Sequence, residues 1–150
     1  VADPLLKVSS DYWDRLMAGV WDLEPEANLF PVTEETVGKW RSIYNEKMGP
    51  VDNSATMTAR DEKEILSGGA YFVHDAGELL GIGWMKGSEL LCIASVKPGA
   101  GERVLKTLLP LADTDRVTLD VASTNIRARR LYERLGFIPV EEKSKWYQIL

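Results

Sequence analysis

The sequence predicts an α+β fold on a mixed sheet, and three observations support this. Residues 70–96 hold three strand-like runs separated by short turns with glycine, which is typical of an antiparallel meander. A helical pattern at 99–112 separates strand patterns ending at 96 and starting at 116, so those two strands should be parallel. No repeat, low-complexity tract or linker divides the 150 residues, so we expect one domain over 1–150.

The N-terminal third is expected to supply helices that cover the sheet. A short strand is predicted at Leu5–Val8, and Asp11 opens a helix with an apolar stripe that includes Trp21. The stretch between Pro25 and Pro31 is predicted to be a loop. A second helix follows Thr33 and ends at Gly49-Pro50; after a loop at 52–58, a short helix is expected over 59–67.

The remaining strands and helices follow from periodicity. Strands are predicted at Ala70–His74, Leu79–Met85, Leu90–Val96 and Arg116–Ala122, and extended structure resumes at Ile138–Val140.

The stretch Asn125–Phe137 has the clearest local pattern. Ala128, Leu131, Tyr132 and Leu135 fall on one helical face, and the opposite face carries arginines. Asn125 can cap the start of this helix, and Gly136 suits a left-handed residue at its end. We therefore predict a short amphipathic helix with Phe137 folded back onto its last turn.

The net charge of −5 argues against nucleic acid as the main partner. Residues 1–35 carry eight acidic and two basic side chains, which could attract a cationic ligand or simply form a solvated surface. No apolar run has the length of a membrane span, and the single Cys92 is compatible with a reducing compartment. We expect a cytoplasmic protein with no membrane partner and no metal.

A Gly99-Ala-Gly101 turn leads into the helix predicted before residue 112. The first N–H groups of such a helix, at Gly101, Glu102 and Arg103, suit a phosphate. The turn is not a Walker loop or a dinucleotide fingerprint, which require other residues, and it could equally be a plain tight turn.

The run Asn125-x-x-Ala128-x-x-Leu131-Tyr132-x-x-Leu135-Gly136-Phe137, preceded by Leu119-Asp120-Val121 and by the Gly-x-Gly turn, resembles the GNAT-type N-acetyltransferases, which use acetyl-CoA. The resemblance covers residues from about 70 to 150. It implies a three-layer α/β/α fold with a mostly antiparallel sheet. Two central parallel strands would splay apart there, the first of them carrying a bulge.

The resemblance also implies the ligand contacts. The pantetheine arm would lie between the splayed strands, bonded to backbone near Ala94 and Val96 and held by Asn125 beside Ala128. The diphosphate would lie on amides of Gly99, Gly101, Glu102 and Arg103. This sequence departs from the family at two places: Pro98 directly precedes Gly99, and Arg103 stands where the family has a small residue. The Arg103 guanidinium could hinder the diphosphate or contact it.

Tyr132 is the candidate general acid for the leaving thiolate, although it could instead be a core aromatic. Asp120 is the first candidate for the general base, with a purely structural role as the alternative. His74, Glu78 and Glu89 are weaker candidates at turns. Trp21, Trp40, Tyr44 and Trp84 could line an acceptor pocket or belong to the core.

The expected function is direct transfer of an acetyl group from acetyl-CoA to a primary amine of a small molecule or peptide, without a covalent intermediate on Cys92. Two alternatives stay open: a non-catalytic acyl-CoA-binding or sensing module, and a protein-interaction scaffold with the same fold. Exposed sheet edges make a homodimer possible.

Overall fold

The computed structural model describes residues 5–10, 27–49, 56–114, 116–122 and 125–144. For residues 5–10, 120, 122 and 138–144 it describes the backbone alone. The helix predicted from Asp11, with Trp21, lies outside the described residues.

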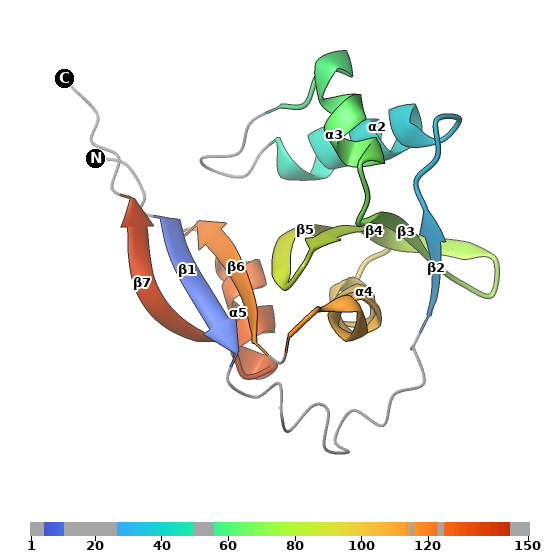
Figure 1. Ribbon diagram of the computed structural model, residues 1–150. Helices are drawn as coiled ribbons and strands as arrows, with labels where there is room; N and C mark the ends of the chain where they lie inside the picture. The colour runs from blue at the N-terminus through green and yellow to red at the C-terminus, as the bar shows by residue number, and fades with distance from the viewer. Residues whose placement is uncertain (1–4, 11–26, 50–55, 115, 123–124, 145–150) are drawn as a thin grey trace.

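The described strands form one seven-stranded sheet in the order β2-β3-β4-β5-β6-β1-β7 (Figure 1). All neighbouring strands are antiparallel except β5 and β6, which are parallel as the crossover predicted. The strands are β1 (Leu5–Ser10), β2 (Asn28–Pro31), β3 (Ala70–Asp75), β4 (Glu78–Lys86), β5 (Glu89–Ser95), β6 (Val117–Ala122) and β7 (Ile138–Ser144).

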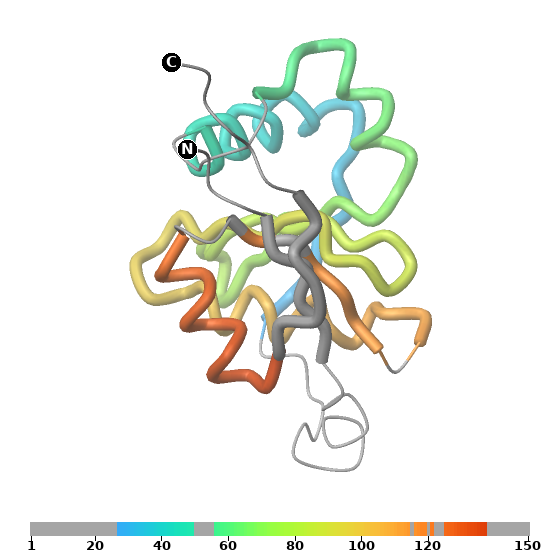
Figure 2. Tube along the Cα trace, turned by 90° about the vertical axis from the view of Figure 1, so that its left-hand side faces the viewer, coloured from blue at the N-terminus to red at the C-terminus, as the bar shows by residue number. Residues whose placement is uncertain are grey.

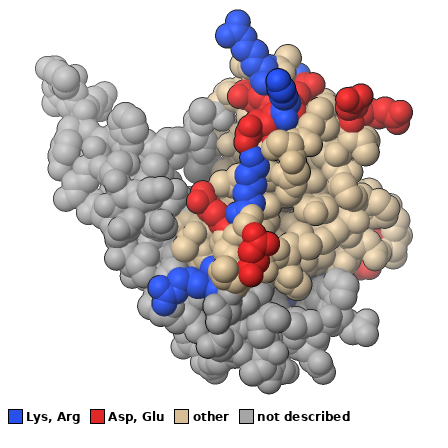
Figure 3. Space-filling model, in the orientation of Figure 1, with Lys and Arg blue, Asp and Glu red and all other residues tan. Residues whose placement is uncertain are grey.

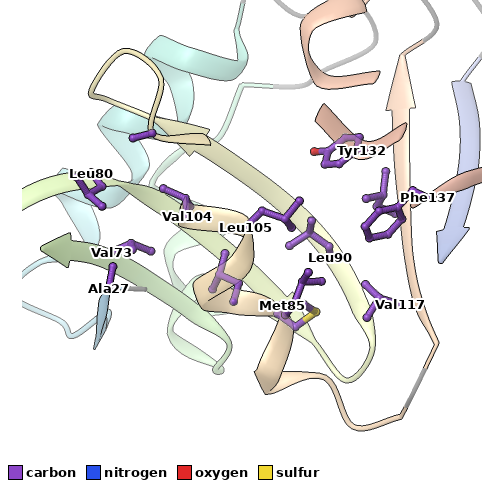
Figure 4. Close-up of a cluster of buried hydrophobic side chains, with 14 of the residues drawn as sticks. Ala27, Val73, Leu80, Met85, Leu90, Val104, Leu105, Val117, Tyr132 and Phe137 are labelled. Carbon is purple, nitrogen blue, oxygen red and sulfur yellow. The ribbon is translucent and has the colours of Figure 1, made fainter. Parts of the chain in front are cut away.

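Helices cover both faces of this sheet. On one face lie α2 (Val37–Met48) and α3 (Glu62–Leu66), where Trp40 and Ile65 pack onto Phe72 and Ile82. On the other face lie α4 (Gly101–Leu108) and α5 (Ile126–Arg134), whose apolar sides join a second core cluster that is drawn in Figure 4. The predicted α+β fold with three layers is therefore confirmed.

The loop predicted between Pro25 and Pro31 was wrong over its described part, because Asn28–Pro31 form the edge strand β2 beside β3. The Val32 N–H donates to the Ala70 carbonyl at 3.1 Å. Since the pattern repeats every second residue, Pro31 occupies a position that faces away from β3, where the missing N–H costs no ladder bond. Proline therefore marks the outer edge of the sheet here.

The N-terminal strand β1 lies between two strands from the C-terminal third of the chain. It pairs with β6 from Leu5↔Ala122 to Ser10↔Val117, and on its other side with β7. In the described sheet, β7 is therefore joined to the other strands through β1 (Figure 1).

Candidate functional site

The parallel strands β5 and β6 are paired over a short distance only. Their register consists of Glu89↔Thr118 and Leu90↔Leu119. A bulge follows at once, because Trp84 of β4 is opposite Cys92 whereas Met85 is opposite Leu90, so Leu91 is the extra residue. Beyond this bulge β5 stays paired with β4 and separates from β6. Both the bulge and the splay expected from the family resemblance are thus present.

The bulge changes which backbone groups of β5 face β6. The Val96 N–H donates to the Leu80 carbonyl of β4 at 2.9 Å, as the Lys97 N–H does at 3.3 Å. Ladder bonds alternate along a strand, so Ala94 also directs its backbone to β4, opposite Ile82. The groups that face the opening belong to Ile93 and Ser95. The Val96 N–H is therefore bonded to Leu80, and the ligand contact expected at backbone near Ala94 and Val96 stays a prediction.

Tyr132 is fixed at this opening by the way α5 ends. The Phe137 N–H donates to the Tyr132 carbonyl at 3.0 Å and the Gly136 N–H donates to the Glu133 carbonyl at 3.0 Å, with Gly136 at φ +97°. These two bonds form a Schellman motif, in which the residue after the glycine packs on the last turn. The rings of Tyr132 and Phe137 are accordingly 5.7 Å apart between centroids.

The Tyr132 hydroxyl is a buried polar group without a partner in the part of the chain that the structure describes. The residue is 8% exposed, and no described residue forms a hydrogen bond with its hydroxyl. Figure 4 shows the ring beside β6, with the oxygen directed away from Phe137. Burial, and secondarily the nearby Cys92 thiol, raise the pKa of Tyr132 well above its ordinary value. The group therefore stays protonated near neutral pH and can donate a hydrogen bond.

Cys92 follows the extra residue Leu91 of the bulge and belongs to the core cluster that contains Trp40 of α2. Its side chain is 6% exposed, and burial raises the pKa of the thiol to about 12. Burial, then the Cys92 and Asp61 charges, also raise the pKa of Tyr44 on α2. A thiol kept neutral by burial is a poor nucleophile, which agrees with a reaction that does not use a cysteine intermediate.

The start of α4 forms the other end of the candidate site. Residues 97–100 make a tight turn in which the Ala100 N–H donates to the Lys97 carbonyl at 3.1 Å, with Pro98 and Gly99 in the middle. Gly99 has φ +80°, which defines a type II turn. The helix then begins at Gly101, and the N–H groups of Gly101 and Glu102 have no acceptor within the helix. This arrangement suits an anion.

Arg103 lies in the first turn of α4. Its guanidinium forms an ion pair with the Asp75 carboxylate at the end of β3. Glu102 lies in the first turn of α4, and its carboxylate is 3.7 Å from the Lys106 ammonium and 3.9 Å from the Arg134 guanidinium of α5. These two cations offset a negative charge that would otherwise repel a phosphate.

Asn125 caps α5 as predicted, because its Oδ1 accepts from the Ala128 N–H at 3.4 Å. The side-chain amide nitrogen of Asn125 is left to donate elsewhere. Ala128 is half-buried and packs against the core cluster under α4 and α5. These two residues adjoin Tyr132 on the same helix.

The candidates for the general base lie on different strands and turns. Asp120 lies in β6 opposite Lys7 of β1, but its side chain is outside the described atoms. His74 packs its ring against Phe30 and Phe72. Glu78 pairs with Lys97 at 2.8 Å and Glu89 is exposed at a turn.

Two of the proposed acceptor-lining aromatics are structural. Trp40 is fully buried and its indole N–H donates to the Tyr71 carbonyl at 3.1 Å. The Trp84 indole N–H donates to the Gly68 carbonyl at 3.0 Å. Tyr44 stacks on Trp40 but is only half-buried. A ligand could therefore reach Tyr44 more easily than the buried Trp40 and Trp84.

Among the described residues, no cluster of histidine, cysteine or acidic side chains could hold a metal ion. The described helices are also too short or too polar to cross a bilayer.

The arrangement of the chain is similar to that of solved acetyltransferases. An acetyltransferase of the GNAT family from Colwellia psychrerythraea matches 91% of this chain and 53% of its own, with 15% identity and a TM-score of 0.64. A GNAT-family putative acetyltransferase from Novosphingobium aromaticivorans matches 92% and 60%, with 18% identity and a TM-score of 0.57. The chain thus spans between half and two thirds of the length of these two proteins.

A third similar structure holds a ligand. AAC(6')-Iy, solved with the bisubstrate analog CoA-S-monomethyl-acetylneamine, matches 83% of this chain and 99% of its own, with 12% identity and a TM-score of 0.55. No protein-family model matches the sequence, and no curated protein matches it either. The chain therefore has a GNAT-type fold, the fold of N-acetyltransferases.

Proposed function

We propose that this chain is an N-acetyltransferase that transfers the acetyl group of acetyl-CoA directly to a primary amine, and that residues 1–150 form one domain for this purpose. The observation that carries the proposal is the buried Tyr132 hydroxyl, which shares a core cluster with Leu90 of β5 and Leu119 of β6 and has no partner among the described residues. A buried hydroxyl without a partner costs about 1–3 kcal/mol, so a ligand atom at that place would compensate for it. Two of the similar structures are acetyltransferases by name and one is a putative acetyltransferase, and AAC(6')-Iy was solved in complex with a CoA-containing bisubstrate analog.

In this proposal the residues of the chain divide the binding of acetyl-CoA. Backbone groups of Ile93 and Ser95 bond the pantetheine arm in the manner of an added strand. The amide of Asn125 holds the same arm from α5. The first turn of α4, at Gly101 and Glu102, binds the diphosphate.

Tyr132 assists the transfer. As the amine nitrogen bonds to the carbonyl carbon, the carbon–sulfur bond breaks and the sulfur becomes a thiolate. The Tyr132 hydroxyl donates a hydrogen bond to that sulfur. Because its pKa is raised, complete proton transfer to a thiolate with a conjugate-acid pKa of about 8.5 is uphill, so we assign Tyr132 mainly to hydrogen-bond stabilisation. The amine proton leaves to a base, for which Asp120 remains the candidate.

The test is acetyl transfer by the purified chain to a panel of amines: polyamines, an aminoglycoside, lysine and a peptide amino terminus. Thiol release is followed spectroscopically. Tyr132→Phe should lower kcat by about 10²-fold, the effect of losing one general acid or hydrogen-bond donor, and leave the KM for acetyl-CoA nearly unchanged. Tyr71→Phe is the matched control, a half-buried tyrosine of β3 that should retain full activity.

The two alternatives give different results. A non-catalytic sensing module would bind acetyl-CoA in a titration but acetylate no amine. An interaction scaffold would show no binding even at millimolar acetyl-CoA. Equal kcat for the wild-type chain and Tyr132→Phe would remove Tyr132 from the mechanism.

A further inference from the structure

Helix α5 carries a row of arginines on one side. Arg127, Arg130 and Arg134 are three and four residues apart, so their side chains follow one another along the helix surface. Arg127 and Arg130 are exposed, and the Arg134 side chain is 60% exposed. We call these three residues the arginine row. By contrast, the face of the molecule in Figure 3 has basic and acidic groups interspersed.

The arginine row borders the start of α4. Arg134 lies 3.9 Å from the Glu102 carboxylate, and a Cβ added to Gly101 would be 3.5 Å from the Leu131 side chain of α5. Figure 2 shows the two helices next to each other. The other two arginines of the row precede Arg134 on the same side of α5, the side next to α4. The arginine row therefore forms a positive border beside the first turn of α4, which itself carries the acidic Glu102.

The local charges explain why this border is needed. Arg103 in the first turn of α4 is paired with Asp75, and Lys97 in the preceding turn is paired with Glu78. Glu102 brings a negative charge into the first turn of the helix. Without α5, the start of α4 would offer a phosphate the helix dipole, backbone N–H groups and Lys106, which lies 3.7 Å from the Glu102 carboxylate. The excess of arginine on α5, four against a single glutamate in Ile126–Arg134, supplies the missing charge.

Coenzyme A carries all of its phosphates at the end opposite its sulfur. With the sulfur at Tyr132 and the diphosphate at α4, the 3′-phosphate of the adenosine emerges at the surface beside α5. We propose that the arginine row binds this 3′-phosphate and makes the chain select CoA esters over donors that lack it. The inference rests on the proposed function.

The experiment compares three acetyl donors: acetyl-CoA, acetyl-dephospho-CoA without the 3′-phosphate, and acetyl-phosphopantetheine without the nucleotide. Affinities are measured by calorimetry with the wild-type chain, Arg127→Glu and Arg130→Glu. Arg60→Glu is the matched control, because it makes the same charge change at an exposed position near α3. Arg127→Gln and Arg130→Gln repeat the test without a new negative charge, and thermal unfolding confirms that each variant is folded.

The wild-type chain should bind acetyl-CoA about tenfold more tightly than acetyl-dephospho-CoA, the effect of roughly two exposed charge contacts. Each variant of the row should lose most of this preference while keeping its affinity for acetyl-dephospho-CoA within about threefold, and Arg60→Glu should behave as wild type. The preference should also shrink as salt rises.

Equal wild-type affinity for the first two donors would overturn the inference and leave the proposed function intact. A preference that survives in all four variants of the row would do the same. Tight use of acetyl-phosphopantetheine would point to a phosphopantetheine carried by an acidic protein and contradict the 3′-phosphate site. Failure to bind any donor would reject the proposed function, and the inference with it.

Discussion

At the scale of single residues, Tyr132 shows how a site is kept at the expense of stability. Its ring belongs to the core, packed against Phe137, but its hydroxyl has no partner among the described residues. A phenylalanine at that position would fill the same space with no polar atom to bury. Under the proposed function, a ligand atom would accept the hydrogen bond that this hydroxyl can donate.

We therefore predict that Tyr132→Phe stabilises the unliganded chain by about 1 kcal/mol, the lower part of the desolvation cost of an unpaired polar group, while it lowers activity. The measurement is urea unfolding of both chains without ligand. Excess acetyl-CoA should reduce or reverse the difference, because only the wild type gains the hydrogen bond. Loss of more than about 1 kcal/mol in the unliganded variant would mean that the hydroxyl has a structural partner.

Some of these residues could be predicted from the sequence and others could not. The capping of α5 by Asn125 and its end at Gly136 depend on neighbouring residues, so the local pattern was sufficient. The Asp75–Arg103 ion pair joins β3 to α4. Its two residues are far apart in sequence, so their contact depends on how the helix packs on the sheet and leaves no local pattern. The bonding of Val96 to Leu80 depends on the bulge at Leu91, which shifts the alternation of β5 by one residue.

At the scale of elements, the end of α5 determines where the Tyr132 ring lies. Gly136 holds a left-handed conformation that lets Phe137 return to the helix. The same turn leads into β7. The end of the helix, the contact between Tyr132 and Phe137 and the start of the strand therefore all depend on Gly136.

Gly136→Ala should destabilise the chain by about 1–2 kcal/mol, the cost of a left-handed alanine, and lower kcat by about tenfold, because small displacements of a catalytic group are costly. Chemical unfolding and acetyl transfer measure the two effects. Gly77→Ala is the control, since Gly77 has φ +80° in the β3–β4 turn and open space around it. It should lose similar stability but no activity. Equal activity of both variants would separate the α5 cap from the site.

Most of the helices and strands could be predicted from hydrophobic periodicity. The three strands of the meander, the strand at 116–122 and the helices α2, α3, α4 and α5 were predicted and are present. The strand β2 was missed because four residues ending in proline carry too little alternation to indicate a strand.

At the scale of the whole molecule, the position of β1 between β6 and the edge strand β7 is the feature that the order of the chain did not reveal. Its existence was predicted from Leu5–Val8, but strand partners far apart in sequence leave no local pattern. In the described sheet, the strand that follows α5 is attached through β1. The site therefore depends on residues at the opposite end of the chain.

Val8→Pro should destabilise the chain by about 3 kcal/mol or more, because proline removes a backbone donor from a strand with partners on both sides. Val8→Thr is the control, since it keeps the N–H and suits a strand. Circular dichroism during thermal unfolding measures both. If the proline variant unfolds no earlier than the threonine variant, β1 does not pair with both β6 and β7.

The account depends on a donor lying between β5 and β6, with its sulfur at Tyr132 and its diphosphate at α4. The most direct measurement is a titration of the ¹⁵N-labelled chain with acetyl-CoA, followed through its backbone amide resonances. We predict saturable shifts at Ile93 and Ser95 in the opening and at Gly101 and Glu102 in the first turn of α4, with Ile82 of β4 little affected. Shifts that avoid both the opening and the start of α4, or no shifts at millimolar acetyl-CoA, would contradict the account.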